Sequence, residues 1–221
     1  MADLTCPIDE FPELEKLAPV RAIFLKKIPG IDVATDRESA LRRLGSIHEA
    51  TLVAQGFSIS TFARAEQVHG CHVAFVHKDA PMLSPGCDAL VTTDPSIGLG
   101  IYVADCAAVY IADRHGRGIA IAHSGRKGTE LGIVPKTIES LRAATGSSAI
   151  DLVLQISPCI RPPHYEVDFA ADIRRQAYAA GLRHIYDDLR CTASQHAEYY
   201  SYRLEKGRTG RLLAAMKLCE H

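Results

Sequence analysis

Short apolar segments dominate the middle of the chain, and their pattern predicts β-strands. Residues 88–92, 99–104, 107–112 and 118–122 are apolar, rich in β-branched side chains, and bounded by Gly, Asp or Pro. Runs of this length fit buried strands better than helices. The same reasoning places further strands at 20–25, 72–77, 150–156 and 212–218, and a hairpin turn at 114–117.

Three other stretches have helical periodicity. Asp36 can cap a helix with an apolar face made by Ala40, Leu44, Ile47 and Thr51. Asp168 can cap another, with a stripe formed by Phe169, Ile173, Ala177 and Ala180 before Gly181.

The remaining helix is expected over 134–145, with Gly146 as its C-terminal cap. Pro135 fits the first turn of this helix, or it kinks a helix that begins nearer Thr129. The mixed order of strands and helices predicts an α/β or α+β domain with a mixed β-sheet flanked by helices. We expect a single domain over residues 1–221.

Composition narrows the function classes. The 25 basic and 26 acidic residues give a net charge of −1, with no basic tract, so binding to nucleic acid is not expected. No segment approaches the ~20 apolar residues of a membrane span, and the acidic N-terminus does not resemble a secretory signal. Seven cysteines without a CxxC pair argue against a disulfide framework, and together these features favour the cytoplasm.

Two histidines and one cysteine are candidates for a metal site. His69, Cys106 and His123 each lie at or beside the end of a predicted strand. Two imidazoles and a thiolate suit a divalent metal such as zinc and leave one position open for water or substrate. Taken singly, each has an ordinary interpretation: a surface histidine, a small buried thiol and a core histidine. Spacing alone does not show that they meet.

Three further segments offer binding groups. Ser124, Gly125, Arg126 and Lys127 follow a strand directly, as in turns that bind phosphate, although a solvated turn is equally consistent. A proline-restricted loop carries Arg161, Tyr165 and Glu166, where Glu166 is either a general base or part of a surface ion pair. Arg203 follows three nearby tyrosines that could line a ring-binding pocket.

In order along the chain, these segments resemble the laccase-domain family of bacterial proteins, also called multicopper polyphenol oxidase-like, purine nucleoside phosphorylase and peptidoglycan editing factor. The resemblance covers about residues 60–218, whereas the first 60 residues match poorly. The matching motifs are Gln67-Val68-His69-Gly70, Asp88-Ala89-Leu90-Val91-Thr92, Ala104-Asp105-Cys106, Ala122-His123, Ser157-Pro158-Cys159-Ile160, Tyr165-Glu166-Val167, Cys191-Thr192 and Tyr200-Ser201-Tyr202-Arg203.

The resemblance implies a fold similar to the cysteine-hydrolase-like domains of cytotoxic necrotising factors. It also implies a catalytic zinc on His69, Cys106 and His123, and small-molecule substrates: phosphate with adenosine, inosine, guanosine or methylthioadenosine. Adenosine deamination is implied as a second activity. We expect a monomer or weak homodimer. One departure is clear: where the family has Trp-Arg, this chain has Arg126-Lys127, and Lys offers a point charge in place of a planar fork.

Three alternatives remain open at this stage. A copper polyphenol oxidase would need many histidines, usually in HxH pairs, and the ten histidines here form none. The resemblance also implies a peptidoglycan-editing amidase that acts on a nucleotide-linked muramoyl precursor. A metal-stabilised binding module without catalytic activity is the third alternative.

Overall fold

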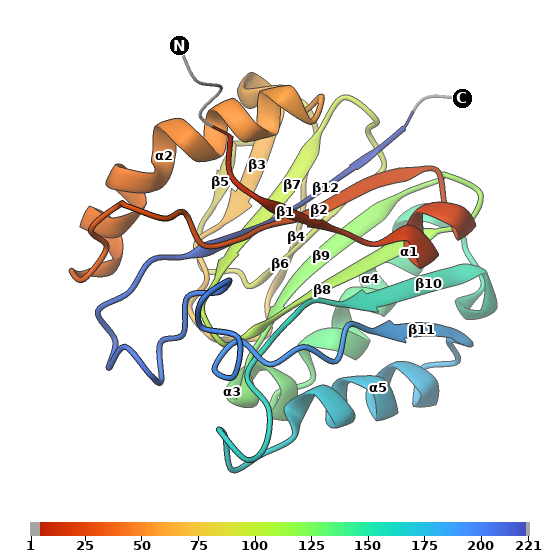
Figure 1. The fold of residues 1–221 in the computed structure, drawn as a ribbon. Helices are drawn as coiled ribbons and strands as arrows, with labels where there is room; N and C mark the ends of the chain where they lie inside the picture. Colours follow the sequence, from red (N-terminus) through yellow and green to blue (C-terminus); the bar gives the residue numbers. More distant parts are fainter. Residues whose placement is uncertain (1–4, 220–221) are drawn as a thin grey trace.

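Two β-sheets form the centre of the molecule (Figure 1), and each has six strands. The computed structural model describes residues 5–219. In the first sheet the strand order is β1-β2-β12-β7-β3-β5, and in the second it is β11-β10-β8-β9-β6-β4. Each sheet contains both parallel and antiparallel pairs, for example β3 with β7 and β12 with β7 in the first. The predicted mixed α/β class is therefore confirmed, with the strands divided between two sheets.

The strands of the first sheet come from both ends of the chain and from its middle. They are β1 (Ile8–Glu10), β2 (Val20–Leu25), β12 (Leu212–Leu218), β7 (Gly98–Val103), β3 (Phe62–Ala65) and β5 (Leu83–Ser84). The second sheet consists of β11 (His184–Asp187), β10 (Leu152–Ile156), β8 (Ala107–Asp113), β9 (Ile119–Ser124), β6 (Ala89–Thr92) and β4 (Val73–Phe75).

Helices cover the outer faces of the two sheets (Figure 1). The long helix α2 (Arg37–Ala54) lies over the first sheet, whereas α4 (Ile133–Thr145) and α5 (Phe169–Ala179) lie over the second. The shorter elements are α1 (Pro12–Leu17), α3 (Arg126–Glu130) and the 3-10 turns Ile59–Thr61 and Ala149–Asp151. Among the described residues, no helix has both the length and the apolar character needed to cross a membrane.

Alternate residues of the second sheet belong to two separate hydrophobic clusters. In β8, Tyr110 packs between the two sheets, whereas Val109 and Ile111 pack under α4 and α5. In β9, Ile121 packs between the two sheets, whereas Ala120 packs under the helices. Because both faces of these strands are buried, their sequences are almost continuously apolar, which is why the sequence pattern identified them.

Most of the predicted elements are present. The side chains of Asp36 and Asp168 cap α2 and α5, accepting hydrogen bonds from the backbone N–H groups of Ser39 and Ala171 at 2.9 Å and 3.0 Å. Pro135 lies in the first turn of α4, because Gly132 adopts a left-handed conformation and separates α3 from α4. The hairpin at 114–117 is also confirmed, with Gly116 at φ +72°.

Several elements were not predicted. They are β1, α1, β3, β5 and β11, which are short or lie at the sheet edges, and α3, which forms where a glycine turn was expected. The predicted strand 72–77 is shorter than expected and spans Val73–Phe75. Local pattern carries little information for segments of two to six residues, because their pairing depends on distant strands.

Candidate functional site

Two loops and the end of one strand bring His69, Cys106 and His123 together. His69 lies between β3 and β4, Cys106 lies in the short connection from β7 in one sheet to β8 in the other, and His123 is near the end of β9. Their candidate donor atoms all lie within 4.8 Å of one another. The two imidazole rings meet edge to face, with centroids 4.7 Å apart. The structure thus brings together the three residues that the sequence offered as metal ligands.

Asp88 is the buried residue that orients both histidines. Its carboxylate accepts a hydrogen bond from Nδ1 of His123 at 2.8 Å and from the backbone N–H groups of His69 at 2.9 Å and Gly70 at 2.7 Å. With Nδ1 of His123 engaged in this way, Nε2 is the ring nitrogen left for a metal. This role of Asp88 was not predicted, because in the sequence Asp88 is only the first residue of a strand motif.

Unusual backbone conformations concentrate around these residues. Gln67, His69 and Asp105 have φ values of +68°, +58° and +80°, although none of them is glycine. Such conformations are sparsely populated and persist where surrounding contacts hold them. The side chain of Gln67 bonds to both backbone groups of Tyr102, and Asp105 accepts hydrogen bonds from Thr192 Oγ1 at 2.7 Å and the Arg203 backbone N–H at 2.7 Å.

The electrostatics of these side chains favour a thiolate beside a protonated imidazole. Burial raises the pKa of the Cys106 thiol, but the imidazoles of His123 and His69 outweigh this effect, so the pKa lies below its ordinary value. Burial lowers the pKa of His123, but the Cys106 thiolate and the Asp88 carboxylate outweigh it, so the pKa lies above its ordinary value. A divalent cation would take the place of these protons on the same donors.

Gly125 allows the Cys106 thiol to approach β9. A Cβ atom built on Gly125 would lie 2.4 Å from Cys106 Sγ, which is closer than real contacts allow. The φ of Gly125 is −95°, so a positive backbone angle does not explain the glycine. The turn that the sequence suggested as a phosphate cradle therefore serves first to make room for the thiol.

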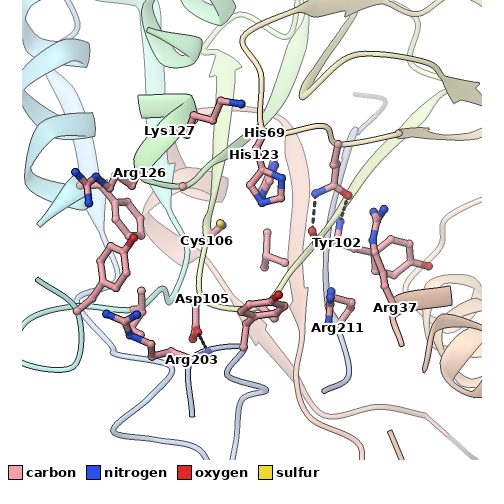
Figure 2. Close-up of a pocket in the computed structure, with 18 of the residues that line it drawn as sticks. Arg37, His69, Tyr102, Asp105, Cys106, His123, Arg126, Lys127, Arg203 and Arg211 are labelled. Carbon is pink, nitrogen blue, oxygen red and sulfur yellow. Dashed lines mark hydrogen bonds between the residues drawn. The ribbon is translucent and has the colours of Figure 1, made fainter. Parts of the chain in front are cut away.

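The three donors open into a cavity of about 830 Å³. Of the predicted substrate-binding residues, Gly125, Arg126, Lys127, Tyr165 and Arg203 line this cavity. In Figure 2, Arg126 and Arg203 lie on one side of Cys106, and Lys127 lies above it near His69.

Two of the predicted binding residues do not line the cavity. Ser124 is fully buried, and its hydroxyl bonds to Thr129 Oγ1 at 2.8 Å. Arg161 forms an ion pair with Asp187, the last residue of the edge strand β11. Their polar groups already have partners within the fold, and neither residue is among those that line the cavity.

Glu166 is held in an ion-pair network at the rim of the cavity. Its carboxylate lies 2.5 Å from Arg203 Nη2 and 3.7 Å from Arg126 Nη1. Arg126 also donates to Glu130 Oε1 at 2.9 Å. Of the two interpretations of Glu166, the structure favours the ion pair, since both of its oxygens face guanidinium groups.

Other cavity residues were missed by the sequence analysis. They include Arg37, at the start of α2, and Tyr102, Lys206 and Arg211, whereas Tyr202 is one of the tyrosines that the sequence offered for a ring-binding pocket. Arg37 lies within the first 60 residues, where the sequence showed no motif of the family, and Arg211 is one of many arginines in polar sequence. No local signal separates such residues from solvated surface positions, because only the fold brings them to the same cavity.

Comparison with known proteins identifies the family of this chain. The family model described as multi-copper polyphenol oxidoreductase laccase matches residues 35–172 and 167–219. The purine nucleoside phosphorylase of Deinococcus radiodurans is 32% identical over 209 residues, covering 83% of this chain and 80% of that protein. Purine nucleoside phosphorylase YlmD of Geobacillus stearothermophilus is 27% identical over 225 residues, covering 84% of this chain and 81% of that protein.

Solved structures agree in fold. The crystal structure of YlmD from Geobacillus stearothermophilus superimposes with a TM-score of 0.83, covering 92% of this chain and 93% of that one at 23% identity. The structure of a hypothetical protein YfiH from Bacillus licheniformis has a TM-score of 0.80, covering 90% and 92% of the two chains at 20% identity. With a family model that matches most of its length and relatives that align over most of theirs, this chain belongs to the multi-copper polyphenol oxidoreductase laccase family.

Proposed function

We propose that the protein is a zinc-dependent purine nucleoside phosphorylase that also deaminates adenosine. The proposed substrates are phosphate with adenosine, inosine, guanosine or methylthioadenosine. The observation that carries the proposal is the convergence of His69, Cys106 and His123 within 4.8 Å at a cavity of about 830 Å³. Relatives that bear the name purine nucleoside phosphorylase support the same reaction class.

The donor set fits zinc. Two imidazole nitrogens and one thiolate are ligands that zinc prefers, and three protein ligands are typical of catalytic rather than structural sites. The Asp88 carboxylate behind His123 is the kind of partner that fixes a metal-bound imidazole. A zinc ion held by these residues would supply Lewis-acid chemistry at its remaining position.

A copper oxidase fits these residues less well. Among the described residues, the candidate ligands form one group of three, His69, Cys106 and His123. A multicopper centre needs several such groups, mostly of histidines. We therefore propose zinc and keep copper as the alternative that metal analysis must test.

The remaining cavity residues have recognisable tasks in this reaction. Tyr165 and Phe169 meet edge to face with ring centroids 5.9 Å apart and line the cavity, so they offer an apolar surface on which a purine can pack. Cationic side chains along the same cavity would bind phosphate and hold it beside the nucleoside. Phosphorolysis and deamination would share this pocket and the same three donors.

Metal analysis combined with a nucleoside assay tests the proposal. The purified protein should contain about one zinc per chain, and it should release free purine base from adenosine, inosine or guanosine only when phosphate is present. Loss of ammonia from adenosine should continue without phosphate. Both products are separated by liquid chromatography.

Two cysteine variants make the assay specific. Cys106→Ala should lose zinc and both activities, whereas Cys71→Ala should keep them, because Cys71 is a thiol of similar exposure that faces Lys136 outside the cavity. Wild-type activity in zinc-free Cys106→Ala protein would overturn the proposal. Copper content with oxygen uptake on a phenol would instead support the oxidase alternative.

A further inference from the structure

The cationic side chains that line the cavity fall into two groups. Arg126 and Arg203 are paired with Glu130 and Glu166 at the rim. Arg37, Lys127, Lys206 and Arg211 also line the cavity, and none of these four forms an ion pair within residues 5–219. The positive charge that remains uncompensated therefore lies on this second set.

Arg37 and Arg211 are the two arginines of that set. Arg37 bonds to the backbone oxygen of Glu66 at 3.3 Å, and Arg211 bonds to the backbone oxygens of Thr209 and Gly210, each at 2.9 Å. Burial lowers the pKa of Arg211, and the positive charge of Arg37 lowers it further. Two like charges near each other, one of them largely removed from water, are costly unless an anion joins them.

We propose that Arg37 and Arg211 form an oxyanion site that holds the phosphate nucleophile, an inference that rests on the proposed function. Each guanidinium presents a planar fork of N–H donors that matches two oxygens of a phosphate group. Arg37 comes from the start of α2 and Arg211 from the residue before β12, so the site depends on elements from opposite ends of the chain.

The positions of these groups suit the reaction. In phosphorolysis, an oxygen of hydrogen phosphate bonds to C1′ of the ribose while the bond from C1′ to the purine nitrogen breaks. The electron pair of that bond goes to the purine, which also receives the proton of hydrogen phosphate, and the other product is ribose 1-phosphate. The nucleophile and the purine must therefore lie on opposite sides of C1′.

Figure 2 shows such a division. His69, Cys106 and His123 lie between Arg37 and Arg211 on one side and Arg126 and Arg203 on the other. The aromatic pair Tyr165 and Phe169 belongs to the side of Arg203, whose guanidinium lies 5.1 Å from the Tyr165 ring centroid. A purine packed on these rings would leave the ribose near the donors and C1′ open toward the two unpaired arginines.

The rival position for phosphate is the turn at Gly125, which the sequence suggested. There the hydroxyl of Ser124 is buried against Thr129, and Arg126 is neutralised by two carboxylates. Lys127 keeps an unpaired charge, but a single ammonium offers no fork for two oxygens. The arginine pair is therefore the better site for a dianion.

Phosphate titration of the zinc-loaded full-length protein tests this site directly. Isothermal titration with inorganic phosphate should give binding that is about tenfold or more weaker in Arg37→Gln and in Arg211→Gln, because each change removes charge-assisted hydrogen bonds. The KM for phosphate should rise by the same factor, while the KM for the nucleoside changes by less than about twofold. Arg64→Gln is the matched control, since Arg64 lies over the Tyr102 ring but does not line the cavity.

The outcomes separate the possibilities. Unchanged phosphate binding in both arginine variants, or a loss confined to Lys127→Gln, would overturn the inference. So would an unchanged KM for phosphate together with weakened binding of a purine 5′-monophosphate, because the pair would then hold a substrate phosphate ester. If Arg211→Gln does not fold, the exposed Arg37 supplies the test alone. If wild-type protein cleaves no nucleoside, the proposed function fails, yet the phosphate titration still decides the anion site.

Discussion

The carboxylate of Asp88 bonds to Nδ1 of His123 at 2.8 Å and, with the same oxygen, to the backbone N–H of His69 at 2.9 Å. One buried acidic residue therefore fixes the imidazole of one candidate ligand and the loop of the other. The pKa of Asp88 is affected first by burial, which raises it, but its bonds to His123 and Gly70 outweigh burial and lower it. The group consequently remains an acceptor beside the candidate metal ligands.

Replacing Asp88 with Asn should weaken zinc binding. An amide cannot accept from all these donors at once, so the His123 ring loses its fixed orientation. Partners of this kind typically change metal affinity by about 10- to 100-fold. Competition with a chromogenic chelator measures the change. Asp113→Asn is the control, since Asp113 is equally buried but bonds to Arg117 and Ser147, away from the site. Equal zinc affinity in both variants would contradict the role given to Asp88.

A methyl group at Gly125 should displace the Cys106 thiol. The new Cβ would lie 2.4 Å from Sγ, so either the thiol or the turn must move. We expect Gly125→Ala to lose most of its zinc affinity and its nucleoside phosphorolysis. In Gly45→Ala nothing lies within 4 Å of the added atom, and the helix should gain about 0.5–1 kcal/mol. If Gly125→Ala binds zinc as tightly as Gly45→Ala, the close approach is not essential.

The strands of the fold were the most predictable part of the structure. Val109 and Ile111 on one face of β8 and Tyr110 on the other are all buried, and such strands are visible in the sequence as apolar runs. Capping by Asp36 and Asp168 was equally visible, because it depends on residues three positions apart. The division into two sheets was not, since pairing between β2 and β12 joins residues nearly two hundred positions apart.

The residues of the candidate site also differ in whether the sequence could predict them. Cys106 and His123 could be proposed because each follows a recognisable strand and suits a metal by its chemistry. Asp88 could not be distinguished from any other aspartate at a strand start until its carboxylate was seen against His123. Arg37 and Arg211 bear no pattern at all, and their relation comes only from the packing of α2 and β12 around one cavity.

Asp105 should be essential for the connection that carries Cys106. Its side chain accepts from Thr192 Oγ1, Ser201 Oγ and the backbone N–H of Arg203. Asp105→Ala leaves these buried donors without an acceptor, each at a cost of about 1–3 kcal/mol, and places Ala in a left-handed conformation. With three donors affected, denaturant unfolding should show a loss of at least about 3 kcal/mol.

An Asp105→Asn variant separates the loss of the hydrogen-bond acceptor from the cost of the left-handed backbone. Asp105→Asn tolerates the left-handed backbone and keeps one acceptor oxygen, so it should lose less than half as much stability as Asp105→Ala. Asp168→Ala, which removes only the cap of α5, sets the scale at about 1 kcal/mol. If both Asp105 variants unfold like the Asp168 variant, the network around Asp105 contributes little.

Acid should destabilise the protein through His48. This side chain is 1% exposed, stacks on Tyr102 with ring centroids 5.8 Å apart, and has no hydrogen-bond partner for either ring nitrogen among the described residues. Burial lowers its pKa from 6.5 to about 4. Between these values the unfolded chain binds a proton that the folded protein does not, so stability falls as the pH falls below 6.5.

Unfolding experiments on the wild type and on His48 variants measure how much His48 contributes to the acid destabilisation. Each pH unit in that window costs about 1.4 kcal/mol, so His48 should account for a loss of about 2 kcal/mol between pH 6.5 and pH 5. In His48→Leu and His48→Phe this contribution disappears, because neither side chain titrates, and Phe also keeps a ring against Tyr102. Denaturant unfolding at pH 6.5 and pH 5 should therefore give a smaller difference for both variants than for the wild type. A difference equal to that of the wild type would assign the acid sensitivity to other groups.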